Sequence, residues 1–231
     1  MGKLFDIQLV FEYFPKLLSR LHITLSIVFA ATVLGVILGT VLALFRLAKT
    51  PILNQVAVVY ISFMRGTPII VQMFIVYYGL PLLLLMIHLD INHWDKLIFI
   101  IITYGLNMAA FMAEIIRASI IGVSIGQTEA AYSVGMSRLQ AFRRIVAPQA
   151  LLIALPSLGM NMMGLLQNTS IAFSLGIIDV IGKARVIGAS TYHTLEGYVG
   201  AAVIFLALCI LMEYGFTHIE KKLKYKMIGL I

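Results

Sequence analysis

The chain has 231 residues, of which 61% are hydrophobic and only 12% are charged, and its formal net charge is +7. This composition excludes an ordinary soluble domain and is typical of a protein that folds in a lipid bilayer. The positive charge does not indicate nucleic-acid binding, because the lysines and arginines are scattered between long apolar runs. The single cysteine, Cys209, lies in an apolar run and cannot form a disulfide within the chain.

Five segments are predicted to span the membrane, so we expect an all-α, polytopic fold. Each segment is mainly apolar and long enough, at about 1.5 Å per residue, to cross a hydrocarbon core about 30 Å thick. The first is too long for the apolar part of a signal peptide and has no cleavage site after it, so we expect it to stay attached. The predicted spans are residues 21–45, 68–88, 97–117, 150–172 and 195–216.

The second span is expected to begin at a break. Residues 50–89 contain one charged residue, Arg65, and are too many for a single straight helix across the bilayer. Gly66 is flexible, Thr67 can cap a helix, and Pro68 suits the first helical position. We therefore expect a new helix to begin at Pro68 and part of the preceding segment to lie outside the membrane or along its surface.

The distribution of positive charge predicts the orientation. An odd number of spans places the two termini on opposite sides of the membrane. The loop between spans three and four and the segment after span five share a side with the residues that follow span one, and all three are basic. We therefore expect an outer N-terminus and an inner C-terminus. The residues counted are Arg46, Lys49, Arg138, Arg143, Arg144, Lys221, Lys222, Lys224 and Lys226.

A compact basic loop, residues 123–148, separates spans three and four and is predicted to form two short helices on the cytosolic side. Thr128 can cap the first helix, over about 129–134. Glu129 would then lie in the first turn, where its negative charge interacts favourably with the positive end of the helix dipole. Gly135 suits the left-handed position that ends a helix.

The second helix of the loop should begin at Ser137, because Ser137 and Gln140 have the spacing of a capping box, and should end at Pro148. Ala130 and Ala131, on the first helix, are the smallest good helix formers and would let another protein approach closely. Docking onto a partner and packing against the chain's own spans are equally compatible with these features.

The loop also carries a spaced set of residues that resembles the cytosolic motif of permease subunits of binding-protein-dependent ATP-binding-cassette (ABC) importers. The stretches RGTPIIVQMFIVYYGLP, AEIIRASI and GQTEAA look like the polar amino acid subgroup, so the resemblance covers residues 20–220. It implies one permease domain over 1–231, with its core at 20–220 and its coupling loop at 123–148. The motif residues are Glu129, Ala130, Ala131, Gly135, Ile145 and Pro148.

This sequence departs from the family pattern at two places. Ala147 precedes Pro148 where members of the family typically have leucine. The run Gln167-Asn168-Thr169-Ser170 stands where a Lys-Asp-Thr-Ser type run is usual, so a charge pair is missing from span four.

The resemblance implies a subunit of an ATP-driven importer of a polar amino acid, of the cystine, arginine, histidine or glutamine type, in the bacterial cytoplasmic membrane. The chain itself would be no enzyme and hold no cofactor, since ATP and Mg would bind to separate ATP-binding subunits. In the family, the loop is the coupling helix that sits in a groove of the ATPase. The other implied partners are an extracytoplasmic solute-binding protein or lipoprotein, a second permease copy or a paralogue, and membrane lipid.

The sequence itself offers no nucleotide or metal site. The nearest match to a phosphate-binding loop, residues 176–184 (GIIDVIGKA), has five residues between its glycines and lacks the hydroxyl residue after the lysine. The five histidines have no metal-ligand spacing. They are His22, His88, His93, His193 and His218.

A translocation path should appear as polar residues along one face of a span. Small and polar residues recur at spacings of three and four in spans three and four. The polar members expected to line a path are Asn107, Ser157, Asn161 and Asn168. The alternative is helix packing through small residues and hydrogen bonds between helices. Packing is also the expected role of the GxxxG pair in span one, Gly35 and Gly39.

A different class, an ion-coupled secondary transporter without an ATPase partner, is disfavoured. Five spans do not divide into two equal inverted halves, and no charge other than Arg65 lies deep in a span. Glu114 and Arg117, one turn apart, are expected to form an ion pair at the cytosolic end of span three.

Overall fold

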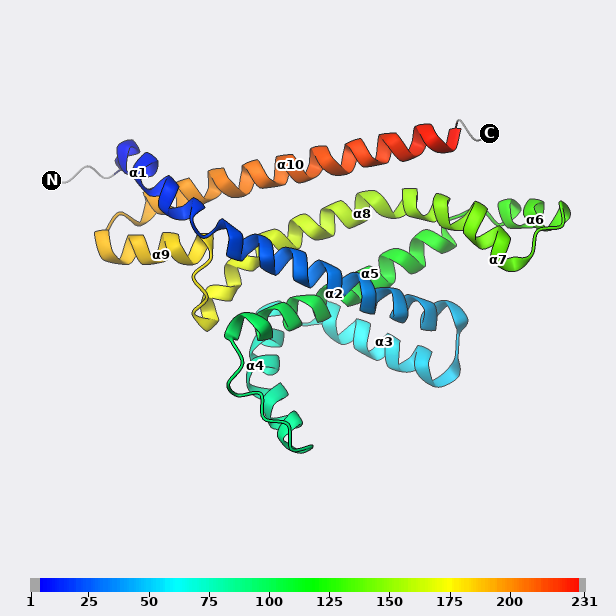
Figure 1. Cartoon of the computed structure of the whole chain (residues 1–231), viewed down its shortest axis with the longest axis horizontal. Helices are drawn as coiled ribbons and strands as arrows, with labels where there is room; N and C mark the ends of the chain where they lie inside the picture. Colours follow the sequence, from blue (N-terminus) through cyan, green and yellow to red (C-terminus); the bar gives the residue numbers. More distant parts are fainter. Residues whose placement is uncertain (1–4, 229–231) are drawn as a thin grey trace. The chain divides into compact units, whose positions relative to one another are not determined.

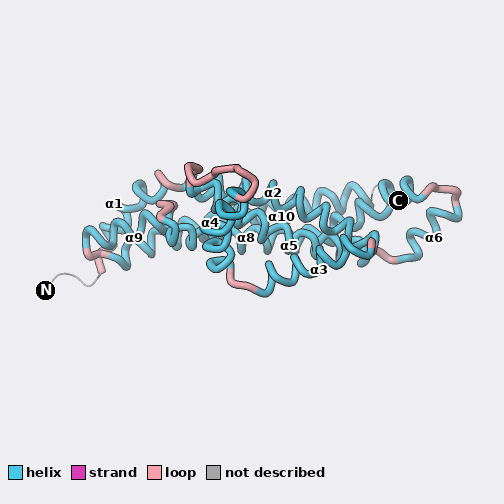
Figure 2. The backbone as a smooth tube through the Cα atoms, turned by 90° about the horizontal axis from the view of Figure 1, so that it is seen from below, coloured by secondary structure: helices cyan, strands magenta, loops and turns pink. Residues whose placement is uncertain are grey.

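The computed structural model describes residues 5–228, with side chains up to Tyr225, so the side chain of Lys226 lies outside the described residues. This part of the chain contains helices and loops and no strand, which confirms the all-α prediction (Figures 1 and 2). Four helical segments are long and apolar enough to cross a membrane, and an interrupted pair of helices makes a fifth. The four are Leu21–Ala48, Lys96–Ile121, Arg138–Leu175 and Thr194–Tyr225.

Two short helices, α1 and α9, were not predicted, because neither has the length or continuous apolar character of a span. The last helix, α10, continues well beyond the predicted end at residue 216. The elements are α1 (Ile7–Leu18), α2 (Leu21–Ala48), α3 (Pro51–Gly66), α4 (Ile69–Leu85), α5 (Lys96–Ile121), α6 (Ile125–Ser133), α7 (Arg138–Ala141), the π-helix η1 (Phe142–Val146), α8 (Ala147–Asn168), the 3₁₀ helix η2 (Thr169–Leu175), α9 (Val180–Thr191) and α10 (Thr194–Ile228).

The chain packs as two compact units. The first contains the residues up to Val33 together with Thr67–Gly105 and Met162–Leu211. The second contains Leu34–Gly66, Leu106–Asn161 and the residues from Met212 onward. The long helices α2, α5, α8 and α10 therefore contribute one part to each unit.

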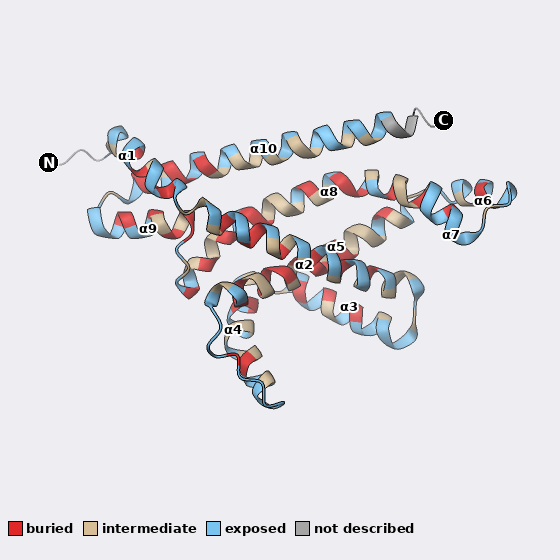
Figure 3. Cartoon of the chain, in the orientation of Figure 1, coloured by how far each residue is buried: buried red, intermediate tan, exposed pale blue. Residues whose placement is uncertain are grey.

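Each unit has its own apolar cluster. In the first unit, α1, α9 and α10 bury Tyr13, Leu17, Val180, Ala184, Ile187, Ala201 and Ile204. In the second, α3 and α5 bury Ile61, Met64, Ala110 and Ala113. Many large apolar side chains nevertheless remain exposed on the outer faces of the helices (Figure 3). Such a surface is unusual for a soluble protein and is what a bilayer requires.

The predicted break after Arg65 is confirmed, but its cap differs. Helix α3 ends at Gly66 and α4 begins at Ile69, so Pro68 is the capping residue and not the first helical one. The hydroxyl oxygen of Thr67 accepts a hydrogen bond of 2.8 Å from the side-chain amide of Gln72, whose NH₂ also donates to the Thr67 carbonyl.

The GxxxG pair is a packing device, as expected. A β-carbon built on Gly35 would lie 2.5 Å from Cγ of Met108, and one on Gly39 would lie 2.5 Å from Cβ of Met112. Both distances are well below van der Waals contact. Within the second unit, α2 therefore approaches α5 at a distance that only glycine permits.

Candidate functional site

The first helix of the basic loop, residues 123–148, begins earlier than predicted. Helix α6 starts at Ile125 with Ser124 in the N-cap position, so the prediction that Thr128 caps it is wrong. Ser124 comes three residues after Ile121, the last residue of α5, and its side chain makes no capping hydrogen bond, but the helix begins directly after it and so gains a turn before Thr128. As a result, Glu129 lies in the second turn, where its side chain is exposed.

The end of α6 is a Schellman motif centred on Gly135. Gly135 has φ +80°, which confirms the predicted left-handed position. Its N–H donates to the carbonyl of Tyr132 at 2.9 Å, and the N–H of Met136 donates to the carbonyl of Ala131 at 3.0 Å. These two bonds satisfy carbonyls that would otherwise end the helix without partners.

The second arm of the loop starts as predicted but does not stop. The Ser137 N–H donates to Oε1 of Gln140 at 2.9 Å, and the Gln140 N–H donates to Oγ of Ser137 at 3.4 Å, which confirms the capping box. Pro148 does not end this helix, contrary to the prediction. Helix α7 passes through η1 into α8, and Pro148 is the second residue of α8.

The π-helix explains how the chain tolerates Pro148. Proline in a regular helix removes one hydrogen bond and its ring collides with the carbonyl four residues earlier. Here the N–H of Ala147 donates to the carbonyl of Phe142, five residues back. Because a π-turn is wider than an α-turn, the hydrogen bonds just before the proline do not follow the regular pattern of an α-helix. The second arm of the basic loop is therefore continuous with the fourth predicted span.

The two alanines of the motif have different environments. Ala130 is exposed, whereas Ala131 is only 4% exposed. Helix α6 contacts α7 and η1, and the side-chain amide of Gln149 donates to Oε1 of Gln127 at 3.3 Å. The expected close approach of another protein can thus involve Ala130, while Ala131 contributes to packing within the loop.

The predicted path residues are divided between the two units, with Asn107, Ser157 and Asn161 in the second and Asn168 in the first. Asn107 is half-buried and its amide donates to the carbonyl of Met64 at 3.3 Å. Ser157 and Asn161 are half-buried, and neither side chain makes a hydrogen bond to another described residue. Asn168 belongs to the other unit. Its side chain is exposed and its carbonyl accepts a hydrogen bond from the Tyr104 hydroxyl.

The predicted ion pair is present and has a third member. Oε2 of Glu114 accepts from Arg117 at 2.7 Å, and Oε1 lies 3.5 Å from the guanidinium of Arg46 on α2. One turn before Glu114, the ring of Phe111 lies 5.4 Å from the guanidinium of Arg65. The Arg46 contact joins α2 to α5 within the second unit, where the two helices also approach closely at Gly35 and Gly39.

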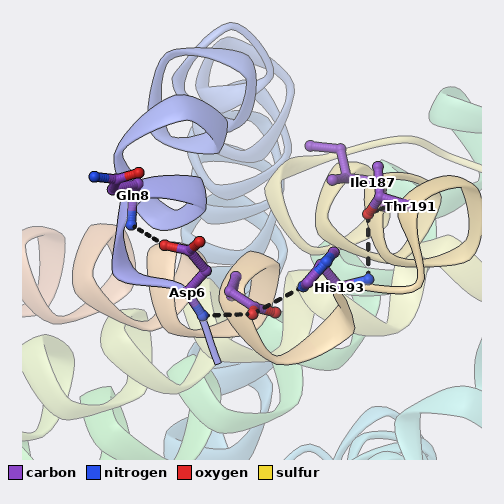
Figure 4. A network of polar contacts seen from close by, with 6 residues as sticks. Asp6, Gln8, Ile187, Thr191 and His193 are labelled. Carbon is purple, nitrogen blue, oxygen red and sulfur yellow. Dashed lines mark hydrogen bonds and ion pairs between the residues drawn. The ribbon is translucent and has the colours of Figure 1, made fainter. Parts of the chain in front are cut away.

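Sequence reasoning missed a polar network in the first unit (Figure 4). Glu196, 1% exposed, accepts hydrogen bonds from the Asp6 N–H at 3.0 Å and from Nδ1 of His193 at 3.1 Å. Asp6 in turn caps α1 by accepting from the Gln8 N–H at 2.9 Å. The network ties the start of α1 to the turn between α9 and α10, and so has a structural role.

Asp179 is a second polar residue that sequence reasoning left without a role. Its buried carboxylate caps α9, where Oδ1 accepts from the Gly182 N–H at 2.8 Å, while Oδ2 has no partner among the described residues. Desolvation by burial raises the pKa of Asp179 to about 6, against the opposing hydrogen bond from Gly182. An Asp before a short helical segment is a recognisable capping signal, but the burial is not visible in the sequence.

Comparison with known proteins agrees with the fold. Residues 23–225 match the family described as "Binding-protein-dependent transport system inner membrane component". The L-cystine transport system permease protein TcyL of Bacillus subtilis is 45% identical over 97% of this chain and 94% of its own length. The probable amino-acid ABC transporter permease protein PatM of Vibrio harveyi is 38% identical over 95% of this chain and 96% of its own length.

Among solved structures, an amino acid ABC transporter crystallised with histidines is 31% identical and has a TM-score of 0.82, with 94% of this chain and 98% of that chain covered. The family match spans most of the sequence, and the apolar helices supply the means to cross the bilayer. The chain therefore belongs to the inner membrane components of binding-protein-dependent transport systems, and is a multi-pass permease of the cytoplasmic membrane, of the kind found in amino acid ABC importers.

Proposed function

We propose that this permease belongs to an ATP-driven importer of a polar amino acid and works as a dimer, with itself or with a paralogue. Two ATP-binding subunits and an external binding protein complete the transporter. The observation that carries this proposal is the basic loop, whose exposed helix, left-handed glycine and capping box form a defined projection. The substrate class is supported by relatives named for L-cystine, arginine, nopaline and octopine transport.

In this proposal, the basic loop faces the cytosol and is the contact for the ATP-binding subunit. Glu129 and Ala130 are exposed and supply the contacting surface. Ala131 and Gly135 set its shape, one by packing inside the loop and the other by turning the chain. The exposed arginines Arg138, Arg143 and Arg144 add positive charge that can orient the loop on an acidic partner.

The path for the amino acid runs beside the polar residues Asn107, Ser157, Asn161 and Asn168. An unpaired amide or hydroxyl is costly in hydrocarbon, and the free hydrogen-bonding groups of Ser157 and Asn161 are better accommodated by water or substrate. Closure of the two ATPases on ATP would pull the loops of the two permeases together. The path would then change from inside-open to outside-open, where the binding protein delivers its ligand.

The test is uptake of radiolabelled amino acids into proteoliposomes that contain the permease, its ATP-binding subunits and its binding protein. Wild-type uptake should require ATP. Gly135→Pro should abolish it, because proline cannot adopt φ +80°, and Glu129→Lys should reduce it by reversing a charge on the exposed helix. The matched control is Gly126→Ala, where the nearest atom to a new β-carbon, Oγ of Ser124, is 3.7 Å away.

Two results would count against the proposal. Wild-type rates in both Gly135→Pro and Glu129→Lys would remove the coupling role of the loop. Uptake driven by an ion gradient in liposomes that lack the ATP-binding subunits would indicate a secondary transporter instead.

A further inference from the structure

Arg65 is the only charged residue between Lys49 and Asp90. It lies in the last turn of α3 and its side chain is exposed. Within the described part of the chain it has no salt bridge, and its guanidinium lies 5.4 Å from the centre of the Phe111 ring. This guanidinium is therefore held by an aromatic ring while its hydrogen-bond donors remain available.

The contact with Phe111 places Arg65 far from either end of α5. This helix has 26 residues, and Phe111 lies roughly 15 Å from the end that leads into the basic loop, at about 1.5 Å per residue. Phe111 is also six residues inside residue 117, where the predicted span ends, so a guanidinium beside it is costly if it faces hydrocarbon. Arginines in this situation face water-filled cavities or bind a counter-ion.

The charges around Arg65 favour an anion. The neighbouring carboxylate, Glu114, is already bound by Arg117 at 2.7 Å and by Arg46 at 3.5 Å. One carboxylate therefore faces three guanidinium groups in this part of the second unit. Positive charge remains uncompensated, and in a region of low dielectric constant it attracts an anionic group strongly.

The end of α3 is also fixed in place and has space beside it. The Tyr60 hydroxyl donates to the carbonyl of Leu106 at 2.8 Å, and the amide of Asn107 donates to the carbonyl of Met64 at 3.3 Å. These bonds tie the last turns of α3 to α5. A β-carbon built on Gly66, the residue after Arg65, meets no atom within 4 Å, so a small molecule has room there.

We propose that Arg65 binds the α-carboxylate of the transported amino acid on its way through the permease. A guanidinium can donate two parallel hydrogen bonds to a carboxylate, a geometry that lysine lacks. The guanidinium lies over the ring of Phe111, 5.4 Å from its centre, and the described residues form no salt bridge with it that would compete with the ligand. The proposal rests on the import function proposed above and deepens it, because it assigns recognition of the group that all α-amino acids share.

The experiment measures binding to the solubilised complex of permease and ATP-binding subunits, without the binding protein, which would recognise the substrate itself. Tritiated L-cystine, L-arginine, L-histidine and L-glutamine are the probes, and the α-amide of each is the competitor. Wild type should bind one of them and discriminate against its amide, in which the carboxylate charge is absent. Arg65→Gln should weaken binding about tenfold or more and lose most of the discrimination. Arg65→Lys should be intermediate, and Arg20→Gln is the matched control.

Three results would overturn the proposal. The first is an Arg65→Gln complex that binds and discriminates as wild type does. The second is a wild-type complex that binds none of the four probes although ATP-dependent uptake through the binding protein is intact, which leaves the import function standing. The third concerns lipid. If wild-type uptake depends on phosphatidylglycerol in the liposomes, and Arg65→Gln loses this dependence but still discriminates between the amino acid and its amide, Arg65 would be assigned to a lipid headgroup.

Discussion

The basic loop and the contact between α2 and α5 both depend on glycine, but for different physical reasons. Gly135 has φ +80° and no atom within 4 Å of a new β-carbon, so its backbone conformation is what requires glycine. Gly35 and Gly39 have ordinary helical conformations and methionine atoms 2.5 Å from their missing β-carbons, so packing is what requires glycine there. The loop is shaped by residues near in sequence, and the helix contact by residues about seventy positions away.

The strongest test of this difference is Gly39→Val. Its β-carbon would meet the carbonyl oxygen of Ala109 at 2.9 Å and the backbone nitrogen of Ala113 at 3.1 Å, as well as the side chain of Met112. Backbone atoms cannot move aside cheaply, so we expect a loss of more than about 3 kcal/mol of stability, at the upper end of overpacking effects. Thermal unfolding of the solubilised permease measures it. Gly215→Val, where no atom lies within 4 Å, is the control. Equal melting temperatures would contradict the close contact.

A second test compares two N-caps, one exposed and one buried. Ser137 caps α7 in solvent, whereas Asp179 caps α9 from a buried position. Burial raises the pKa of Asp179 from 3.8 to about 6. The folded protein therefore binds the proton more tightly than the unfolded chain, and stability from this group falls as pH rises from about 4 to about 6.

Asp179→Asn should therefore stabilise the permease, by up to about 3 kcal/mol above pH 7, since asparagine is an equally good cap without charge. The difference should shrink toward pH 4, where the carboxyl is protonated in the folded protein and is losing its proton only in the unfolded chain, near its ordinary pKa of 3.8. Melting temperatures of both proteins from pH 4 to pH 8 test this. A constant difference across the range would mean that the Asp179 carboxylate is not destabilised by burial.

Whether a feature could be predicted from the sequence depends in the same way on whether neighbouring or distant residues determine it. The spans, the break after Arg65, Gly135 and the capping box of Ser137 depend on neighbouring residues, and each was predicted, although α10 continues well past the predicted end of the fifth span at residue 216. The start of α6 and the passage through Pro148 were missed, because a cap competes with other nearby caps and a π-turn has no sequence signature. The contact of Arg46 with Glu114 and the burial of Asp179 depend on distant segments, which periodicity does not show.

Gly135→Ala has the smallest expected effect. It also distinguishes most sharply between a role of Gly135 in shaping the basic loop and a role in stabilising the fold. No atom obstructs the new methyl group, so only the strain of φ +80° opposes it, which costs about 1 kcal/mol. The α2–α5 contact lies elsewhere in the unit, so the melting temperature should change little. Uptake should fall more than stability does, because the strain can be relieved by turning the exposed tip of the loop. ATP-dependent uptake and thermal unfolding, measured on the same preparation with Gly126→Ala alongside, give the comparison. A parallel fall in both would mean that Gly135 stabilises the fold and does not specifically shape the projecting loop.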